Sequence, residues 1–518
     1  MRFTALASLL GLTALTACTL PGSEPQGGAN VNERTNGGAQ GEALLTGAMI
    51  VSPDGRFVLA QRNQSTVLLD VEAGKARELP EKIERFVFSR TGNFGLAVLP
   101  ARAGVVRYDL ATLAPTWRVV PALKSGSGAR LARLSTDERS LVLGDDDRVL
   151  VLDAERGDVR GAVPLGTPAT ELTFVPNTNR ALVVGTTTWR DHVPSTAVVD
   201  FDLTTLADKA ITVPNCAAPV LVLPDGSRGF LSPTFCEEGR ASNTAQTWTN
   251  PDPVSVIDLA PSGPTFLKNL PGFGPVVSDE AGSRIVAYLD MKRIDESMFD
   301  DKAQIPAKSG AQFHIMTIEP RSLAFTLTPV GNVLPRFAMA KSGDQLLVDA
   351  TVQNLRGEAS VKATIDSSGK VTVAFSLFGQ QDSLFGAFDL REKKYAAFSG
   401  DAARLDRFVQ MGDQKRVFSL ETSWDGMGGD LHRVDLDAHR SVDLRKSLRD
   451  LGVLADGKTL VLRERLPALR VEASGSIEWY RREQFCFSLD GVSCLRTVLH
   501  QDSVPFQRGP TCVDNHDC

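Results

Sequence analysis

The fold of this chain is decided by a short stretch of sequence, Ser52-Pro53-Asp54-Gly55-Arg56-Phe57-Val58-Leu59-Ala60. Its first four residues are typical of a tight turn, and the four apolar residues at its end predict a buried strand. Another apolar strand is predicted before the turn, at Leu45 to Val51, and a third after it, at Thr66 to Val71. With a weak outer strand near Ala76 to Leu79, the unit predicts four short antiparallel strands connected by hairpins.

The same unit recurs about nine times along the chain, and helical periodicity is nowhere sustained. A repeat of this length that contains only short strands is typical of a β-propeller, in which each repeat forms one blade of a ring. The predicted turns are Ser52-Pro53-Asp54-Gly55, Arg90-Thr91-Gly92-Asn93, Ser135-Thr136-Asp137-Glu138, Pro176-Asn177-Thr178-Asn179, Pro224-Asp225-Gly226-Ser227, Asp279-Glu280-Ala281-Gly282, Lys341-Ser342-Gly343-Asp344, Met411-Gly412-Asp413-Gln414 and Ala455-Asp456-Gly457-Lys458.

An acidic residue ends the third strand in eight of these units. We interpret it as structural, because an Asp that leaves a strand accepts hydrogen bonds from backbone N–H groups of the next turn. The count favours an all-β propeller of eight four-stranded antiparallel blades over residues 43–450, and seven blades is the alternative. Residues 451–518 are then the last hairpins and a disulfide-stapled C-terminal appendage. The acidic residues are Asp70, Asp109, Asp153, Asp202, Asp258, Glu319, Asp389 and Asp435.

These units resemble the YVTN and TolB-like repeats of bacterial propellers, which are similar to WD40 repeats. The resemblance is carried by residues 52–60 and by Val199-Asp200-Phe201-Asp202-Leu203-Thr204-Thr205. It implies the fold only, since such repeats occur in binding modules, scaffolds and some enzymes.

The N-terminus is predicted to be a processing signal. A short positive region and an apolar run lead to Leu15-Thr16-Ala17-Cys18, which resembles the lipobox of bacterial lipoproteins. The resemblance implies a signal peptide at residues 1–17, acylation of Cys18, and anchoring in the bacterial cell envelope, with Thr19 favouring the outer membrane. Residues 18–42 contain almost no apolar side chains and are predicted to be a flexible tether.

Bulk composition fits a folded protein and excludes some partners. The chain of 518 residues is 42% hydrophobic and 23% charged, with a formal net charge of −6. Because nucleic-acid binding needs a concentrated basic patch, no nucleic-acid partner is expected.

Insertions indicate where a partner binds. The connection between the second and third strands lengthens in four successive units, at about residues 186–195, 233–253, 291–310 and 352–382, and these connections share one face of a propeller. Long loops on a rigid scaffold concentrate function, so we expect a binding surface there. The candidate residues are Trp189, Arg190, His192, Glu237, Glu238, Trp248, Lys292, Arg293 and Asp295.

Six cysteines remain after Cys18 is lipidated, an even number in an oxidising compartment. We predict disulfides between Cys216 and Cys236, between Cys486 and Cys494 across a hairpin, and between Cys512 and Cys518. Crossed pairings among the last four cysteines are the alternative.

The sequence lacks the motifs of nucleophilic hydrolases, phosphate-binding loops and attached haem. Six scattered histidines suggest no metal site, so neither a metal nor a cofactor is expected. The favoured function is a non-catalytic lipoprotein whose propeller is a platform for another envelope protein. One alternative is a propeller hydrolase or lyase with a site in a funnel on the long-loop face, using carboxylates and His192. Another is a carbohydrate- or cell-wall-binding module.

Overall fold

The structure is a computed structural model. It describes residues 43–501 except 45–48, 62–65, 101–103, 127, 191–192, 218, 232–252, 280, 292–293, 295, 308–310, 332–335, 341, 350–359, 366–370, 377–384, 401–406, 421–428 and 472–476. Within these ranges, no helix is long and apolar enough to cross a membrane.

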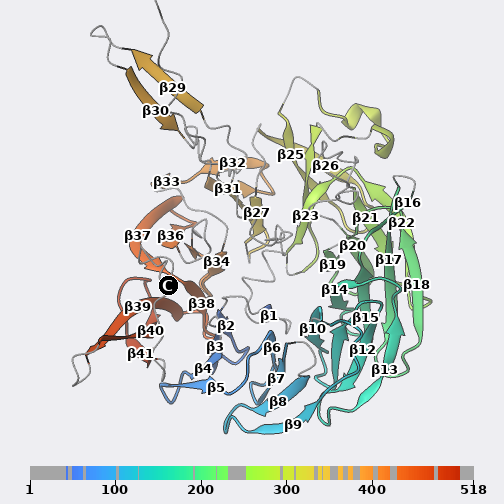
Figure 1. The fold of residues 1–518 in the computed structure, drawn as a ribbon. Coiled ribbons are helices and arrows are strands. Elements are labelled where there is room, and N and C mark those ends of the chain that lie inside the picture. Colours follow the sequence, from blue (N-terminus) through green and yellow to red (C-terminus); the bar gives the residue numbers. More distant parts are fainter. Residues whose placement is uncertain are drawn as a thin grey trace, which may run out of the picture.

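The described chain is a ring of nine antiparallel blades, with the first strand of each blade at the centre (Figure 1). The first five blades are: blade 1, β2 to β5 (Met49–Val51, Phe57–Gln61, Thr66–Asp70, Lys75–Leu79); blade 2, β6 to β9 (Arg85–Phe88, Phe94–Val98, Val105–Asp109, Pro115–Val119); blade 3, β10 to β13 (Leu131–Leu134, Ser140–Gly144, Arg148–Asp153, Val159–Pro164); blade 4, β14, β15, β17 and β18 (Ala169–Phe174, Arg180–Gly185, Val193–Asp202, Asp208–Val213); and blade 5, β19 to β22 (Val220–Val222, Arg228–Leu231, Val254–Asp258, Thr265–Leu270).

The other four blades are: blade 6, β23 to β26 (Phe273–Ser278, Ile285–Asp290, Phe313–Ile318, Phe325–Gly331); blade 7, β27, β28, β31 and β32 (Arg336–Met339, Gln345–Asp349, Phe385–Asp389, Lys394–Ala397); blade 8, β34 to β37 (Arg407–Gln410, Arg416–Leu420, Gly429–Asp435, Arg440–Leu448); and blade 9, β38 to β41 (Asp450–Val453, Leu460–Val471, Ile477–Ser488, Arg496–Gln501). A two-residue strand, β33 (Ser399–Gly400), pairs with β37.

The expectation of eight or seven blades with an appendage is wrong, because residues 450–501 form a complete ninth blade. The sequence count missed it because the third strand, β40, ends at Ser488 rather than at an acidic residue. The acidic residue of this turn is Asp490, two positions later. It accepts hydrogen bonds from the backbone N–H groups of Val492 and Ser493, both at 2.8 Å.

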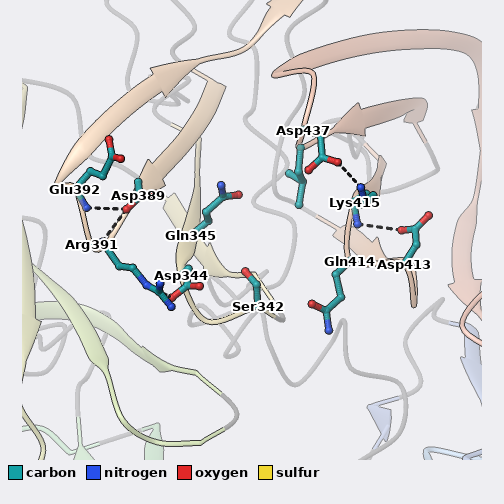
Figure 2. A pocket seen from close by; sticks show the side chains of 11 residues that line it. Ser342, Asp344, Gln345, Asp389, Arg391, Glu392, Asp413, Gln414, Lys415 and Asp437 are labelled. Atoms are coloured by element: carbon teal, nitrogen blue, oxygen red, sulfur yellow. Dashed lines mark hydrogen bonds and ion pairs between the residues drawn. The ribbon is translucent and has the colours of Figure 1, made fainter.

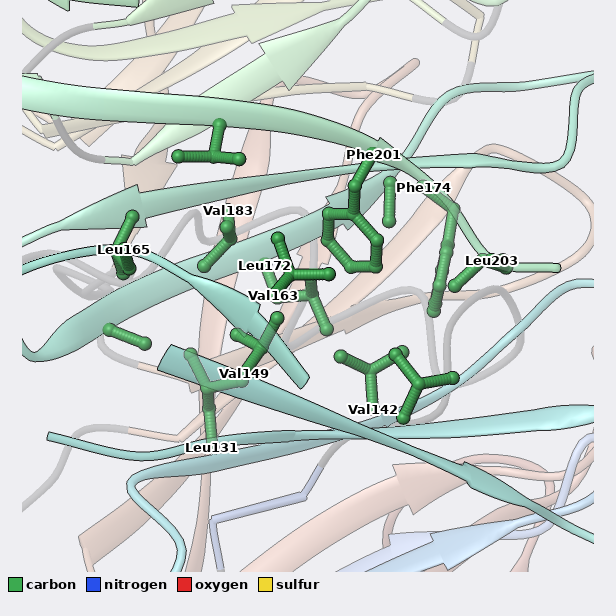
Figure 3. Close-up of a cluster of buried hydrophobic side chains, with 14 residues drawn as sticks. Leu131, Val142, Val149, Val163, Leu165, Leu172, Phe174, Val183, Phe201 and Leu203 are labelled. Carbon is green, nitrogen blue, oxygen red and sulfur yellow. The ribbon is translucent and has the colours of Figure 1, made fainter. Parts of the chain in front are cut away.

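The hydrophobic core consists of layers between neighbouring blades. Figure 3 shows one such layer, where Val142 and Val149 of blade 3 lie near Leu172 and Phe201 of blade 4, all of them buried. Apolar residues occupy both faces of the inner strands because each blade is covered on both sides by its neighbours. Each blade therefore contributes to two layers, as the radial repetition predicts.

The ring closes by packing of blade 9 on blade 1. Met49 and Val58 of blade 1 share a buried cluster with Val461 and Phe485 of blade 9. No strand is exchanged between the two, since each described blade is continuous in the sequence. The chain instead enters through a two-residue strand, β1 (Ala43–Leu44), which pairs antiparallel with the inner edge of β6.

Candidate functional site

The two faces of the ring are defined by the strand connections. Because successive strands are antiparallel, the links between first and second strands and between third and fourth strands share one face, here the turn face. The links between second and third strands, together with the links to the next blade, share the opposite face, here the insertion face. The two faces differ strongly in construction.

On the insertion face, the connections of blades 4 to 9 are extended. Blade 1 needs only residues 62–65 and blade 3 only residues 145–147, whereas blade 5 uses residues 232–253 and blade 7 residues 350–384. The structure therefore confirms long connections in blades 4 to 7. Two further blades have extended connections. They are residues 421–428 in blade 8 and, in blade 9, the end of a hairpin formed by the twelve-residue strands β39 and β40.

The insertion of blade 4 is a small hairpin. A short strand, β16 (Thr188–Arg190), pairs with the start of β17, where Trp189 lies opposite Pro194. Trp189 is half-buried and Arg190 is exposed. The hydroxyl groups of Thr187 and Thr196 form a hydrogen bond of 2.8 Å at the base of this hairpin. It therefore presents an aromatic and a cationic side chain, the two kinds enriched at protein interfaces. The predicted site residue His192 lies outside the described residues.

The insertion of blade 6 folds back onto its own blade. It contains two 3-10 helices, η3 (Glu296–Met298) and η4 (Lys302–Gln304). Phe299 is buried and packs edge-to-face on Phe325 of β26, with ring centroids 5.7 Å apart. Asp300 pairs with Lys268 of blade 5 at 2.9 Å, and Asp301 caps η4. This acidic loop is thus structured by its carboxylates. The predicted contact residues Lys292, Arg293 and Asp295 lie outside the described residues.

The insertion of blade 7 is a separate hairpin, β29 (Ser360–Ile365) with β30 (Val371–Ser376), which stands away from the ring in Figure 1. In blade 9, β39 and β40 stay paired up to Val471 and Ile477, beyond the four-stranded part of the blade. The predicted contact residues of blade 5, Glu237, Glu238 and Trp248, lie outside the described residues.

The structure describes three of the cysteines for which disulfides are predicted. The structure joins Cys486 and Cys494, with Cα atoms 5.3 Å apart, as the hairpin predicts. The turn that this disulfide spans covers residues 489–495, since β40 ends at Ser488 and β41 begins at Arg496. Cys216 is buried and disulfide-bonded. Its predicted partner Cys236, the pair Cys512 and Cys518, and the predicted lipidation site Cys18 lie outside the described residues.

On the turn face, the acidic residues that end the third strands have the structural role predicted for them. Asp202 accepts hydrogen bonds from the N–H groups of Thr204 and Thr205, at 2.9 and 2.7 Å. Asp389 accepts from Arg391 and Glu392 in the same way. Burial alone would raise the pKa of Asp202, but these hydrogen bonds outweigh it and lower the pKa. These two carboxylates therefore stabilise the turns in which they lie.

The turn face also carries a polar hollow of about 610 Å³ between blades 7 and 8 (Figure 2). Its wall comes from the turns of both blades. Asp344 accepts from Arg391 Nε at 2.9 Å and from Arg284 Nη1 at 2.8 Å, and Lys415 Nζ pairs with Asp437 at 2.7 Å. The lining residues are Ser342, Asp344, Gln345, Asp389, Arg391, Glu392, Asp413, Gln414, Lys415, Leu436 and Asp437.

The chemistry of this hollow does not favour proton transfer. Hydrogen bonds from Arg284, and then the charge of Arg391, lower the pKa of Asp344, and the carboxylate of Asp437 raises the pKa of Lys415. General acid–base groups need pKa values moved toward neutrality, whereas these two move away from it. Among the described residues, no group of three or more His, Cys, Asp or Glu is placed to hold a metal ion. The hollow also lies opposite the face where the hydrolase hypothesis places its funnel.

The fold and this arrangement define a nine-bladed β-propeller protein with one elaborated face. No family model matches the chain, and no curated protein matches it. Among solved structures, the chain is similar to a eukaryotic initiation factor at 10% identity and a TM-score of 0.51, over 79% of this chain and 89% of that one. It is also similar to hydrazine synthase of Kuenenia stuttgartiensis, at 12% identity and a TM-score of 0.37, over 64% and 96% of the chains. The first similarity supports the propeller fold alone.

Sequence reasoning missed the hollow, since its walls come from turns about 100 residues apart in the chain, such as those of Asp344 and Asp437. No sequence motif signals such a hollow, because each of its turns is the ordinary turn of its own blade.

Proposed function

We propose that this chain is an envelope lipoprotein, anchored through acyl chains on Cys18, whose propeller holds another protein on its insertion face. The observation that carries the proposal is the run of extended connections in blades 4 to 9, which all leave the same side of a rigid ring. A rigid scaffold lets several loops contact one partner without each having to be ordered on binding.

The contents of the insertions support a protein partner. The β16 hairpin carries half-buried Trp189 and exposed Arg190 at successive positions. The blade 6 insertion is fixed by Phe299 and by the pairing of Asp300 with Lys268, so it forms a shaped surface rather than a loose loop. Aromatic and Arg side chains at the centre of an interface are the ones that contribute most to affinity.

The turn face supports the proposal by contrast. Its carboxylates accept backbone N–H groups of their own turns or pair with neighbouring Arg and Lys. Because these polar groups already have partners on the turn face, few of them are available to another protein. The insertion face is therefore the more suitable binding surface.

The test is chemical crosslinking in membranes, followed by affinity capture of the full lipidated chain and mass spectrometry. Three excision variants replace residues 185–197, 232–254 or 350–384 with an Asn-Gly turn. Each joins residues that already pair across the sheet: Val184 with Val198, Leu231 with Ser255, and Asp349 with Phe385. We expect at least one excision to lose a protein that the wild type captures, whereas the turn-face control Lys415→Ala keeps it.

Two outcomes would overturn parts of the proposal. If every excision variant folds and captures the same proteins as the wild type, the insertion face is not the platform. If Cys18→Ser leaves the fraction of chain in membranes and the incorporation of labelled palmitate unchanged, the lipid anchor is wrong.

A further inference from the structure

We propose that the turn face of the ring lies against a lipid bilayer, where Leu489, Val492 and Leu495 enter the interface between headgroups and acyl chains. The insertion face then points away from the membrane. This inference rests on the proposed function in one respect, the anchor at Cys18.

Exposed apolar side chains are concentrated at one place on the described surface. Of the eight large hydrophobic residues that are exposed, four lie between residues 489 and 499: Leu489, Val492, Leu495 and Leu499, with exposures of 45, 55, 66 and 46%. The first three belong to the turn between β40 and β41, which is on the turn face. The fourth is on the outer strand β41.

This turn, here called the stapled loop (residues 489–495), is held rigidly. The disulfide between Cys486 and Cys494 fixes its two ends. Asp490 accepts hydrogen bonds from two backbone N–H groups of the loop and from the Ser488 hydroxyl at 2.9 Å. These hydrogen bonds, with that of Ser493 the largest cause, lower the pKa of Asp490 to about 2. A loop that is already ordered loses little conformational entropy when its apolar side chains are buried.

Neighbouring blades fix the loop on the ring. Gly491 lies so close to blade 8 that an added Cβ would be 2.7 Å from the Phe418 ring. Arg416 Nη1 donates to the Leu489 carbonyl at 3.3 Å. Arg496, which follows the loop, is exposed and reaches the Val71 carbonyl of blade 1. Arg416 is also paired with Asp413 at 2.7 Å, whereas Arg496 is hydrogen-bonded to backbone carbonyls and directly follows the apolar Leu495. Arg496 is therefore the cation that phosphate headgroups would meet.

The direction of β1 is compatible with an anchor on the same side. The first strand of every blade runs from the insertion face to the turn face, and β1 is antiparallel to such a strand, β6. The chain therefore joins the ring at Ala43 from the turn-face side.

A lipid surface fits this loop better than a protein does. The three side chains are aliphatic, and the backbone N–H groups of Val492 and Ser493 are already satisfied by Asp490. A protein would need a complementary groove for them, whereas acyl chains adapt to any small apolar protrusion.

The test compares two single tryptophan substitutions in the full lipidated chain, reconstituted in vesicles with brominated phospholipids. Val492→Trp lies in the stapled loop, and Val193→Trp is its matched control on the insertion face, since the two valines are 55 and 57% exposed. After subtraction of the wild-type signal, we expect quenching at least twofold stronger at position 492. Equal quenching at both positions overturns the inference.

A second measurement separates this inference from the anchor. In the full chain with Cys18→Ser, replacing Leu489, Val492 and Leu495 together by Ser should lower the fraction that floats with phosphatidylglycerol-containing vesicles at least threefold, with an unchanged melting temperature. If mass spectrometry finds Cys18 unacylated in the wild type while position 492 is still quenched, the anchor fails and the orientation holds. If the triple variant floats as before but loses a crosslinked protein, the loop binds protein and the inference is wrong.

Discussion

The backbone N–H of Met49 donates a hydrogen bond to the carboxylate of Asp450, although the two residues are 401 positions apart in the chain. Met49 begins the first blade and Asp450 begins the last, so this bond fastens the ring where its two ends meet. The same carboxylate accepts the N–H of Leu451 at 2.6 Å. Asp450 is fully buried, and Arg463, its partner in the strand register, is 1% exposed.

Replacement of Asp450 should therefore weaken the closure of the ring. Asp450→Ala leaves the buried N–H groups of Met49 and Leu451 without this carboxylate, and we expect a loss of about 2–4 kcal/mol of unfolding free energy. The control Asp437→Ala removes an exposed ion pair with Lys415 and should cost less than about 1 kcal/mol. Urea unfolding followed by circular dichroism measures both. Equal midpoints for the two variants would contradict the closing role of Asp450.

The turns of blades 1 and 9 also meet, at Gly55 and Ala455. Gly55 has a φ of +72°, and an added Cβ would lie 2.8 Å from the backbone nitrogen of Ala455. Gly166 has a similar φ of +78° but open space around it. Gly166→Ala should cost about 1 kcal/mol, from backbone strain alone. Gly55→Ala should cost at least about 1 kcal/mol more, because the backbone of blade 9 must also move. Thermal melting of the two variants gives this difference directly, and a Gly166→Ala variant as unstable as Gly55→Ala would refute the explanation.

Much of this architecture follows from residues close together in the sequence. The turn of Ser52 to Gly55 and the acidic end of the third strand at Asp70 predict the blade, because both are local devices for satisfying backbone N–H groups. The number of blades does not follow as easily. The third strand of blade 9 ends at Ser488, and its acidic residue, Asp490, comes two positions later, so this strand does not match the pattern of the other blades. In blade 7, the hairpin of β29 and β30 separates the second strand from the third. The hollow depends on the packing of blade 7 against blade 8, and the bond from Met49 to Asp450 depends on ring closure. No local pattern contains either relationship.

Acid should remove a contribution to stability that Asp153 makes at neutral pH. Hydrogen bonding from Arg160, at 2.7 Å, is the largest cause that lowers the pKa of Asp153 from 3.8 to about 2. Because the folded-state pKa is below the ordinary one, the carboxylate stabilises the fold above about pH 4, and this contribution disappears as the pH falls toward 2. Asp153→Asn should thus be less stable than the wild type at pH 7, and the gap should close between about pH 4 and 2.

The control for this pH profile lies in the same turn. Asp158 is 71% exposed, against 11% for Asp153, and pairs with Arg156 at 3.6 Å. The unfolding free energy of Asp158→Asn should stay within about 0.5 kcal/mol of the wild-type value at every pH. A gap for Asp153→Asn that stays constant down to pH 2 would show that its effect comes from packing rather than from charge.

The hairpin of blade 7 should be dispensable for the fold. Strands β28 and β31 pair directly up to Asp349 and Phe385, and residues 350–384 leave from this last pair. Their described part, β29 with β30, pairs with itself as a separate two-stranded sheet. An Asn-Gly turn in place of residues 350–384 suits a two-residue hairpin, and a shorter connection costs no more entropy to close than a long one. We therefore expect the excised chain to unfold within about 1 kcal/mol of the wild type. A loss of more than about 3 kcal/mol would mean that the insertion completes the core of blade 7. In that case, if the excised chain no longer captured a partner protein, the cause would be damage to the ring rather than the loss of a contact surface.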